Sequence, residues 1–242
     1  MSEPTLSRHR ELWQAWLPRQ RWFAGKGRSA RVVTDTAVEI DRSPGVVVML
    51  HLVGVSYDGS STSTETYQVP VVLRREPGPD AAAAFIGSVA DTDGLTWHAY
   101  DGTHDPAYTQ SLLTLLSNGR SVGTSELMVR GVRQPGADVP TSASSAKVMD
   151  GEQSNTSIVI DGAQPLICKV FRVVADGDNP DVVVQSALAA AGSTAVPATV
   201  GWVEGSWATP QGQAHGHLAF VQEFLPATRD AWRVAIDARA AG

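Results

Sequence analysis

The sequence predicts an α+β protein with two antiparallel sheets, and three observations support this prediction. Runs rich in β-branched residues alternate with short polar turns, Ser-Pro-Gly at 43–45 and Asp-Gly-Ser-Ser at 58–61, which is typical of an antiparallel meander. Helical periodicity is confined to a few short segments. Residues 133–145 are rich in Pro, Gly and Ser, so we expect a linker between a domain at 1–132 and another at 146–242.

The N-terminal domain is predicted to open with a helix and to continue as a meander of strands. Ser7 can cap a helix that runs to Leu17, and Pro18 then ends it. The β-type runs predict strands over Arg31–Ile40, Val46–Tyr57 and Thr64–Arg75. Later segments predict helices over Ala81–Ile86 and Pro106–Leu116, the second ended by Asn118-Gly119, and a strand over Val122–Val132.

The C-terminal domain is predicted to hold a five-stranded antiparallel sheet with one helix after the third strand. This order of elements is the plan of the N-terminal lobe (N-lobe) of protein kinases and their small-molecule relatives. The helix is expected over Asp181–Ala191, with Gly192 at its end. The strands are expected at Ala146–Met149, Thr156–Asp161, Pro165–Arg172, Val196–Glu204 and Leu218–Leu225.

Composition and charge exclude several classes of function. A net charge of −6 and the lack of any long Lys/Arg run argue against general nucleic-acid binding. The single cysteine, Cys168, excludes an internal disulfide framework, and the six histidines lack metal-ligand spacing. We find no signal-peptide pattern and no apolar run long enough to span a bilayer. The expectation is a cytoplasmic protein without membrane or nucleic-acid partners.

Lys169 is the first residue that could carry chemistry, because it interrupts an apolar strand. Strand alternation places Ile167 and Lys169 on one face and Cys168 on the other. An ammonium on such a strand needs a partner or access to solvent, since burying it unpaired is costly. It could hold nucleotide phosphates, or it could be an edge-strand lysine that blocks sheet-to-sheet pairing.

The turn at 151–157, with the sequence Gly-Glu-Gln-Ser-Asn-Thr-Ser, lies between the first two strands of the C-terminal domain. It supplies backbone amides and short polar side chains where a phosphate-covering loop would lie. Taken alone, it is typical of an ordinary polar hairpin turn.

Two long motifs resemble the bacterial maltokinases and the actinobacterial glucosamine kinases related to them. The first is Trp-Leu-Pro-Arg-Gln-Arg-Trp-Phe-Ala-Gly-Lys-Gly-Arg at 16–28. The second combines GEQSNTSIVIDG at 151–162, LICKVFR at 166–172 and NPD at 179–181. Shorter similarities occur at Tyr67, Val69-Pro70 and 85–87, so the resemblance runs from about residue 10 to the end.

The resemblance implies a cap domain at 1–132, followed by a kinase-like N-lobe that starts at 146. It implies an enzyme that transfers the γ-phosphate of ATP to a sugar hydroxyl with Mg²⁺, so ATP and a small sugar are the expected partners. Lys169 would hold the α- and β-phosphates. The turn would cover the phosphates through Gln153, Ser154, Asn155, Thr156 and Ser157, and the hinge that meets adenine would be formed by Gln222, Glu223 and Leu225.

The sequence departs from the family pattern in two ways. Val183 stands where the family usually has the glutamate that pairs with the strand-three lysine, so Lys169 pairs elsewhere or the helix sits differently. The family's HGDLHxxQ-like and DFE-like segments are absent, and His215-Gly216-His217 is interpreted as a turn. We therefore expect no catalytic residue in this chain, Mg²⁺ ligands in an absent C-terminal lobe (C-lobe), and an inactive isolated chain that ends in a helix over Thr228–Ala240.

Three functions follow from these observations. The first is the N-terminal part of a maltokinase, which would form maltose 1-phosphate, and the second is that of a glucosamine kinase, which would form glucosamine 6-phosphate. The third is a non-catalytic nucleotide-binding or interaction module, which Val183 favours because such a module needs no ion pair. The basic residues near the N-terminus form either a solvated loop or a docking site for a protein partner, and they are Arg19, Arg21, Lys26 and Arg28.

Overall fold

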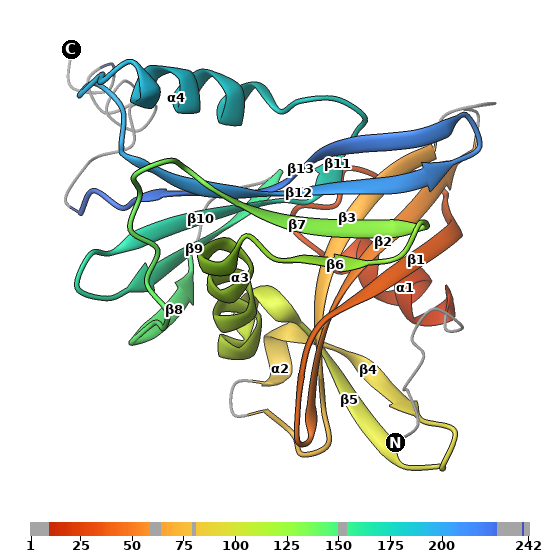
Figure 1. The fold of residues 1–242 in the computed structure, drawn as a ribbon. Helices are drawn as coiled ribbons and strands as arrows, with labels where there is room; N and C mark the ends of the chain where they lie inside the picture. Colours follow the sequence, from red (N-terminus) through yellow and green to blue (C-terminus); the bar gives the residue numbers. More distant parts are fainter. Residues whose placement is uncertain (1–9, 59–63, 79–80, 150–153, 227–238, 240–242) are drawn as a thin grey trace.

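The computed structural model describes residues 10–58, 64–78, 81–149, 154–226 and 239, and its fold is the predicted α+β combination of two antiparallel sheets (Figure 1). The first sheet is six-stranded, in the order β1-β2-β3-β5-β4, with β11 paired to β3. Its strands are β1 (Ala30–Ser43), β2 (Val46–Tyr57), β3 (Thr64–Arg74), β4 (Phe85–Ala90), β5 (Thr96–Asp101) and β11 (Val173–Val174). The three strands of the predicted meander are confirmed.

The second sheet is seven-stranded, in the order β6-β7-β12-β13-β10-β9-β8. It contains the five strands expected for the C-terminal domain, and β6 and β7 extend it. Its strands are β6 (Ser121–Gly123), β7 (Leu127–Arg133), β8 (Ser145–Val148), β9 (Asn155–Asp161), β10 (Leu166–Phe171), β12 (Thr199–Thr209) and β13 (Gly212–Glu223).

Strand pairing changes the predicted boundary between the two halves. The segment expected to be one strand over Val122–Val132 is the β6–β7 hairpin, and β7 pairs with β12 from Leu127 to Arg133. By pairing, residues 121–133 therefore belong to the second sheet and not to the N-terminal half. Residues 134–144 form no helix or strand, as predicted, but Val139 within them is buried in the core beside both sheets.

The helices agree with the sequence predictions at most positions. They are α1 (Arg10–Trp16), the short 3-10 helices η2 (Leu17–Arg19) and η3 (Gly102–His104), α2 (Ala81–Ala84), α3 (Pro106–Asn118) and α4 (Pro180–Ala190). The helix expected over Ala81–Ile86 is wrong after Ala84, because Phe85 begins β4, which pairs with β5. The segment expected to form a helix over Thr228–Ala240 lies outside the described residues, apart from position 239.

Local capping explains where α3 and α4 begin and where α3 ends. The Asp105 side chain accepts from the amide of Ala107 at the start of α3, and Asn179 accepts from Asp181 at the start of α4. A proline occupies the first turn of each helix, where its missing N–H costs nothing. Gly119 ends α3 in the left-handed conformation, with φ 57°, as Asn118-Gly119 predicted.

The middle of the first sheet is buried on both faces. Along β2, Val48, Leu50 and Leu52 face a core that includes α3 and the second sheet. Val47 and Val53 face the opposite way, into a core built around α1 and the Trp-rich segment after it. This alternation follows from the two-residue period of a strand. Because one hydrophobic core contains residues of both sheets, the two halves of the chain pack directly against each other.

The chain also passes from one sheet to the other within a few residues. β10 ends at Phe171 in the second sheet, and β11 begins at Val173 in the first. Arg172 therefore lies at the crossing point. Within the described part of the chain, no helix is both long and apolar enough to cross a bilayer.

Candidate nucleotide site and the junction between the sheets

The face of the second sheet that carries Lys169 differs from its core face, as strand alternation predicted. Leu166, Cys168 and Val170 are buried, whereas Ile167 and Lys169 are partly exposed. On the core face, burial raises the pKa of the Cys168 thiol to about 12. Across the ladder, Lys169 pairs with Ser157 on β9 and with Phe220 on β13.

Lys169 is paired with a carboxylate of α4. Its Nζ lies 3.1 Å from Oδ2 of Asp181, and the two side chains are 26% and 52% exposed. Because Val183 cannot pair with Lys169, either the lysine has another partner or the helix lies in a different position. The structure shows another partner, because Asp181 in the first turn of α4 supplies the carboxylate. Val183 points outward and is 46% exposed.

α4 is held on the Lys169 face by contacts at several points. Val182 is buried against the core, and Gln222 donates from Nε2 to Oε1 of Gln185. The Asn179 amide donates to Nδ1 of His217, 3.0 Å away. Figure 1 shows α4 on one side of the second sheet and α3 on the other. Lys169 lies on the α4 side, because its partner Asp181 belongs to that helix.

His217 belongs to β13, which corrects the prediction that His215-Gly216-His217 forms a turn. Gly216 is required there because the loop before α4 crosses β13, and a Cβ at Gly216 would lie 2.6 Å from the carbonyl oxygen of Ala175. Burial lowers the pKa of His217, although Asp178 and Glu204 oppose this shift and His215 adds to it.

The residues predicted to cover phosphates lie in different environments. Gln153 is outside the described residues, Ser154 is exposed and Asn155 is partly exposed. The Ser157 hydroxyl is buried beside Lys169 and has no partner in the described part of the chain. Thr156 faces the opposite side of the sheet, where its hydroxyl accepts from Arg172. Its side chain therefore belongs to the junction and not to the Lys169 face.

The predicted hinge residues lie at the end of β13. Gln222 is buried on the Lys169 face, where it contacts α4. The Glu223 amide already donates to the carbonyl of Ala198, at 2.9 Å, so it is not a free donor for a base. Leu225 follows the strand and is 40% exposed. The adenine-binding role of these residues stays a prediction.

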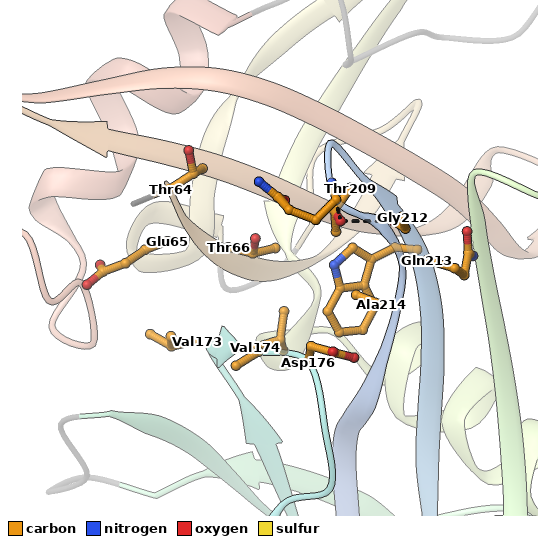
Figure 2. A pocket seen from close by; sticks show the side chains of 13 residues that line it. Thr64, Glu65, Thr66, Val173, Val174, Asp176, Thr209, Gly212, Gln213 and Ala214 are labelled. Carbon is orange, nitrogen blue, oxygen red and sulfur yellow. Dashed lines mark hydrogen bonds between the residues drawn. The ribbon is translucent and has the colours of Figure 1, made fainter. Parts of the chain in front are cut away.

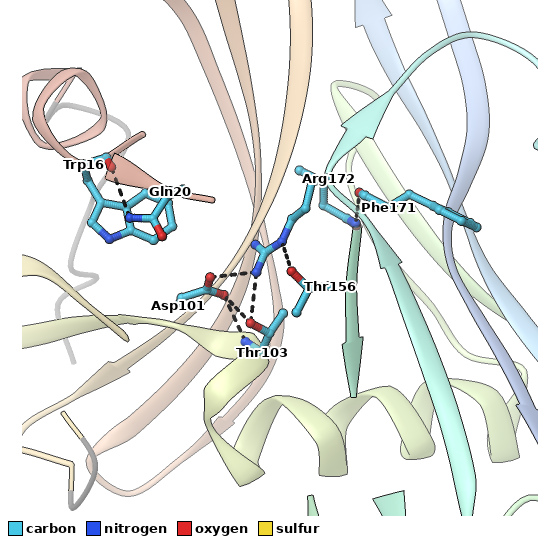
Figure 3. A network of polar contacts seen from close by, with 8 residues as sticks. Trp16, Gln20, Asp101, Thr103, Thr156, Phe171 and Arg172 are labelled. Atoms are coloured by element: carbon cyan, nitrogen blue, oxygen red, sulfur yellow. Dashed lines mark hydrogen bonds and ion pairs between the residues drawn. The ribbon is translucent and has the colours of Figure 1, made fainter. Parts of the chain in front are cut away.

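Sequence reasoning missed Arg172, whose side chain is only 1% exposed. Figure 3 shows its guanidinium between Asp101 and Thr156, which come from different sheets. Nη2 donates to Oδ2 of Asp101 at 2.7 Å and to the Thr103 hydroxyl at 2.9 Å, while Nε donates to Thr156 at 2.8 Å. The signal in the sequence was a second cation three residues after Lys169 in an otherwise apolar run.

The Trp-rich motif at 16–28 packs against the same arginine. The guanidinium carbon of Arg172 lies 4.5 Å from the centre of the Trp22 ring, which is a cation–π contact. Trp22 in turn packs against Trp16, whose carbonyl accepts from the Gln20 side chain (Figure 3). The two motifs that carry the family resemblance therefore meet at one buried charge.

The basic cluster within this motif, formed by Arg19, Arg21, Lys26 and Arg28, is exposed at all four positions. Two of its members have contacts within the fold. The Lys26 ammonium donates to the carbonyl of Arg21, and the Arg28 guanidinium lies 3.8 Å above the ring of Tyr57. Among the residues that the structure describes, no group of three or more His, Cys, Asp or Glu side chains could hold a metal ion.

Residues 16–105 match the family model described as the maltokinase N-terminal cap domain. This segment resembles the maltokinase cap. The match begins at the Trp-rich motif and ends at Asp105, so it spans β1 to β5 and stops just before α3. The predicted resemblance is confirmed for this segment, and we refer to it below as the cap.

Among solved structures, a protein titled "Glucosamine kinase (crystal form B)" aligns with this chain at 16% sequence identity and a TM-score of 0.43. The alignment covers 93% of this chain and 42% of the glucosamine kinase. The chain therefore spans less than half of the length of that protein.

Proposed function

We propose that this chain is the N-terminal part of an ATP-dependent sugar kinase of the maltokinase type, and that it holds the phosphates of ATP. The full-length enzyme would transfer the γ-phosphate to a hydroxyl of a small sugar, either maltose or glucosamine. The cap match supports a relationship to the sugar kinases. The observation that carries the nucleotide role is the partly exposed Lys169–Asp181 pair on the α4 face of the second sheet.

The chemistry of this pair suits a phosphate ligand better than a stabilising role. A half-exposed ion pair contributes roughly 0–1 kcal/mol to stability, so stability alone does not explain a charged pair on an apolar strand. An ammonium has three donors, and Asp181 accepts one of them. The remaining donors can reach phosphate oxygens while Asp181 steadies the amine, as in the lysine–acidic pairs of kinases.

The surroundings of Lys169 fit a nucleotide. The Ser157 hydroxyl, next to Lys169 in the ladder, is a buried polar atom with no described partner, and it could donate to a phosphate oxygen. Ile167 and Val159 are paired across β10 and β9, on the same face as Lys169 and Ser157 and next to them, and both are partly exposed. They offer an apolar surface for a base beside the amine.

The sequence contains neither the HGDLHxxQ-like nor the DFE-like segment that the resemblance associates with Mg²⁺ and the base. The proposal therefore places the metal ligands and the base that orients the sugar hydroxyl in a segment outside this sequence. This chain would bind and orient the phosphates and would carry out no step of phosphoryl transfer by itself. A cytoplasmic enzyme and an acidic protein partner docked on the exposed basic cluster are further parts of the same hypothesis.

The alternative of a non-catalytic module had one supporting observation, the valine at position 183. The Lys169–Asp181 contact weakens this alternative, because the lysine keeps a carboxylate partner without a glutamate at that position. This alternative now predicts that the full-length protein binds ATP but transfers no phosphate to a sugar. A kinase assay of the full-length protein with maltose and with glucosamine separates these outcomes.

The test of the nucleotide role is a calorimetric titration of the chain with ATP. We expect saturable binding that Lys169→Met weakens at least about tenfold, since a charge-assisted hydrogen bond contributes roughly 1.5–3 kcal/mol and 1.4 kcal/mol is a factor of ten. Arg130→Met is the matched control, because Arg130 also forms an exposed ion pair in the second sheet, with Glu204 at 3.4 Å. Equal ATP affinity of the Lys169 variant and the unsubstituted chain would contradict the proposal.

A further inference from the structure

A long groove separates the β12–β13 hairpin from the first sheet. It consists of two adjoining hollows of about 430 and 400 Å³, which are within the roughly 300–1,000 Å³ of small-molecule sites. Figure 2 shows the side chains that surround the first hollow, with Thr66 on one side and Val174 and Asp176 on the other. Both hollows share five lining residues, Thr64, Thr66, Trp207, Thr209 and Gln211, and we call the whole the threonine groove.

The wall formed by the first sheet is polar because the composition of one sheet face changes along its strands. Leu52 on β2 belongs to the core, but two residues later the same face has Gly54, which pairs with Thr34 and Thr66. A Cβ at Gly54 would lie 2.1 Å from the Thr34 hydroxyl oxygen, so the glycine leaves room for that side chain. The face thus changes from aliphatic side chains to hydroxyls where the hairpin crosses it.

Most of these hydroxyls are not used by the fold. The side chains of Thr34, Thr36, Thr64 and Thr66 line the groove and make no hydrogen bond to another described residue. Each hydroxyl can donate one hydrogen bond and accept others. A row of such groups on neighbouring strands suits a ligand that is itself rich in hydroxyls.

The opposite wall adds an aromatic ring and an amide. Trp207 lines both hollows but is only 5% exposed, and Gln211 lies at the hairpin tip. The Gln213 amide donates to the carbonyl of Ser125 and is directed away from Trp207. Because the Trp207 indole is nearly buried, it gives this wall an apolar lining and not a free stacking face. The Gln211 amide can donate to and accept from sugar hydroxyls.

The charge of the lining narrows the class of ligand. Of the two acidic lining residues, Glu65 directs its carboxylate to the hydroxyls of Tyr57 and Tyr67 on the other face of the sheet, so Asp176 supplies the carboxylate of the groove. No Lys, Arg or His is among the described lining residues. A phosphorylated or otherwise anionic ligand would meet only like charges there. The ligand should therefore be neutral and polyhydroxylated.

We infer that the threonine groove is a binding site for a neutral oligosaccharide, separate from the nucleotide face. Lys169, Ser157 and Gln222 are not among the described residues that line the groove. The site would hold a saccharide between the cap and the β12–β13 hairpin without chemistry. Its existence does not depend on ATP binding, so either proposal can fail alone.

The experiment titrates the full 242-residue chain with maltotriose, followed by calorimetry and by amide chemical shifts. We expect saturable binding, with shift changes at Thr66 and Gln211, and no such changes with glucose 6-phosphate. The double variant Thr34→Val/Thr66→Val keeps the shape of the side chains and removes two hydroxyls, and it should weaken binding at least tenfold. Thr96→Val, on an exposed position of β5 away from the groove, should bind like the unsubstituted chain.

Gln211→Ala at the exposed hairpin tip gives a second readout if the double variant fails to fold, and it should also weaken binding. The inference is overturned if maltotriose does not bind saturably, or if these groove variants bind it as tightly as Thr96→Val does. Shift changes that map to the Lys169 face and not to the groove would also overturn it. Loss of ATP binding in Lys169→Met with unchanged maltotriose binding would support two separate sites.

Discussion

Arg172 and Lys169 lie three residues apart on the same segment, yet the fold uses their charges in opposite ways. Arg172 is 1% exposed and donates to Asp101, Thr103 and Thr156. Lys169 is 26% exposed and contacts one carboxylate, which is itself half exposed. One cation is enclosed between the two sheets, and the other faces outward under α4.

The difference shows which of the two charges is structural. A buried charge must be paired and hydrogen-bonded, and losing one partner leaves the other uncompensated. A partly exposed charge can exchange its protein partner for a ligand or for water at little cost. Arg172 therefore connects the cap to the rest of the chain, while Lys169 is the charge to which we assign the proposed nucleotide role.

Replacing Arg172 should produce the largest effect. Arg172→Met leaves the buried Asp101 carboxylate without its cation, and we expect the free energy of unfolding to fall by about 3–5 kcal/mol. Urea unfolding measures this loss. Lys169→Met is the comparison, with an expected change of roughly 0–1 kcal/mol. Similar losses for the two variants would mean that the buried and the open charge do not differ as described.

Removing one acceptor of Arg172 should have an intermediate effect. Thr156→Val keeps the side-chain shape but leaves Nε of Arg172 buried without a partner, and we expect a loss of about 1–3 kcal/mol in urea unfolding. ATP affinity should stay unchanged, because the Thr156 side chain faces away from Lys169. The matched control is Thr96→Val at an exposed strand position. A loss of ATP affinity in Thr156→Val without a loss of stability would show that Thr156 acts at the nucleotide face.

The smallest expected effect is a pH dependence of the helix that carries Asp181. His217 must keep Nδ1 unprotonated to accept from the Asn179 amide, and burial lowers its pKa in the folded chain. The unfolded chain therefore binds the proton more readily. The contribution of His217 to the free energy of unfolding is complete above about pH 6.5 and is lost as the pH falls below that value.

Thermal unfolding between pH 8 and pH 5 tests this dependence. His217→Gln should lose the part of the pH dependence that comes from His217, while His104→Gln, at an exposed position, should keep it. The same pH dependence in all three proteins would contradict the assignment to His217. The charges of Asp178, Glu204 and His215 also influence the pKa of His217. Because salt screens these interactions, the variants are compared at the same ionic strength.

The sequence was sufficient where local periodicity decides the structure. The alternation of Ile167, Cys168 and Lys169 predicted which side chains are buried and which is open, because a strand has a two-residue period. Asn118-Gly119 predicted the end of α3, since glycine tolerates the left-handed conformation. The cap resemblance was also readable from the Trp-rich motif alone, and the family match confirms it.

The tertiary structure decided the contacts between residues that are distant in the sequence. Asp101 and Arg172 are 71 positions apart, and no local pattern indicates that they meet. The pairing of β7 with β12 and the choice of Asp181 as the partner of Lys169 are of the same kind. Local patterns determine which face of a strand or helix is apolar, but the packing of those faces determines which polar groups are enclosed together.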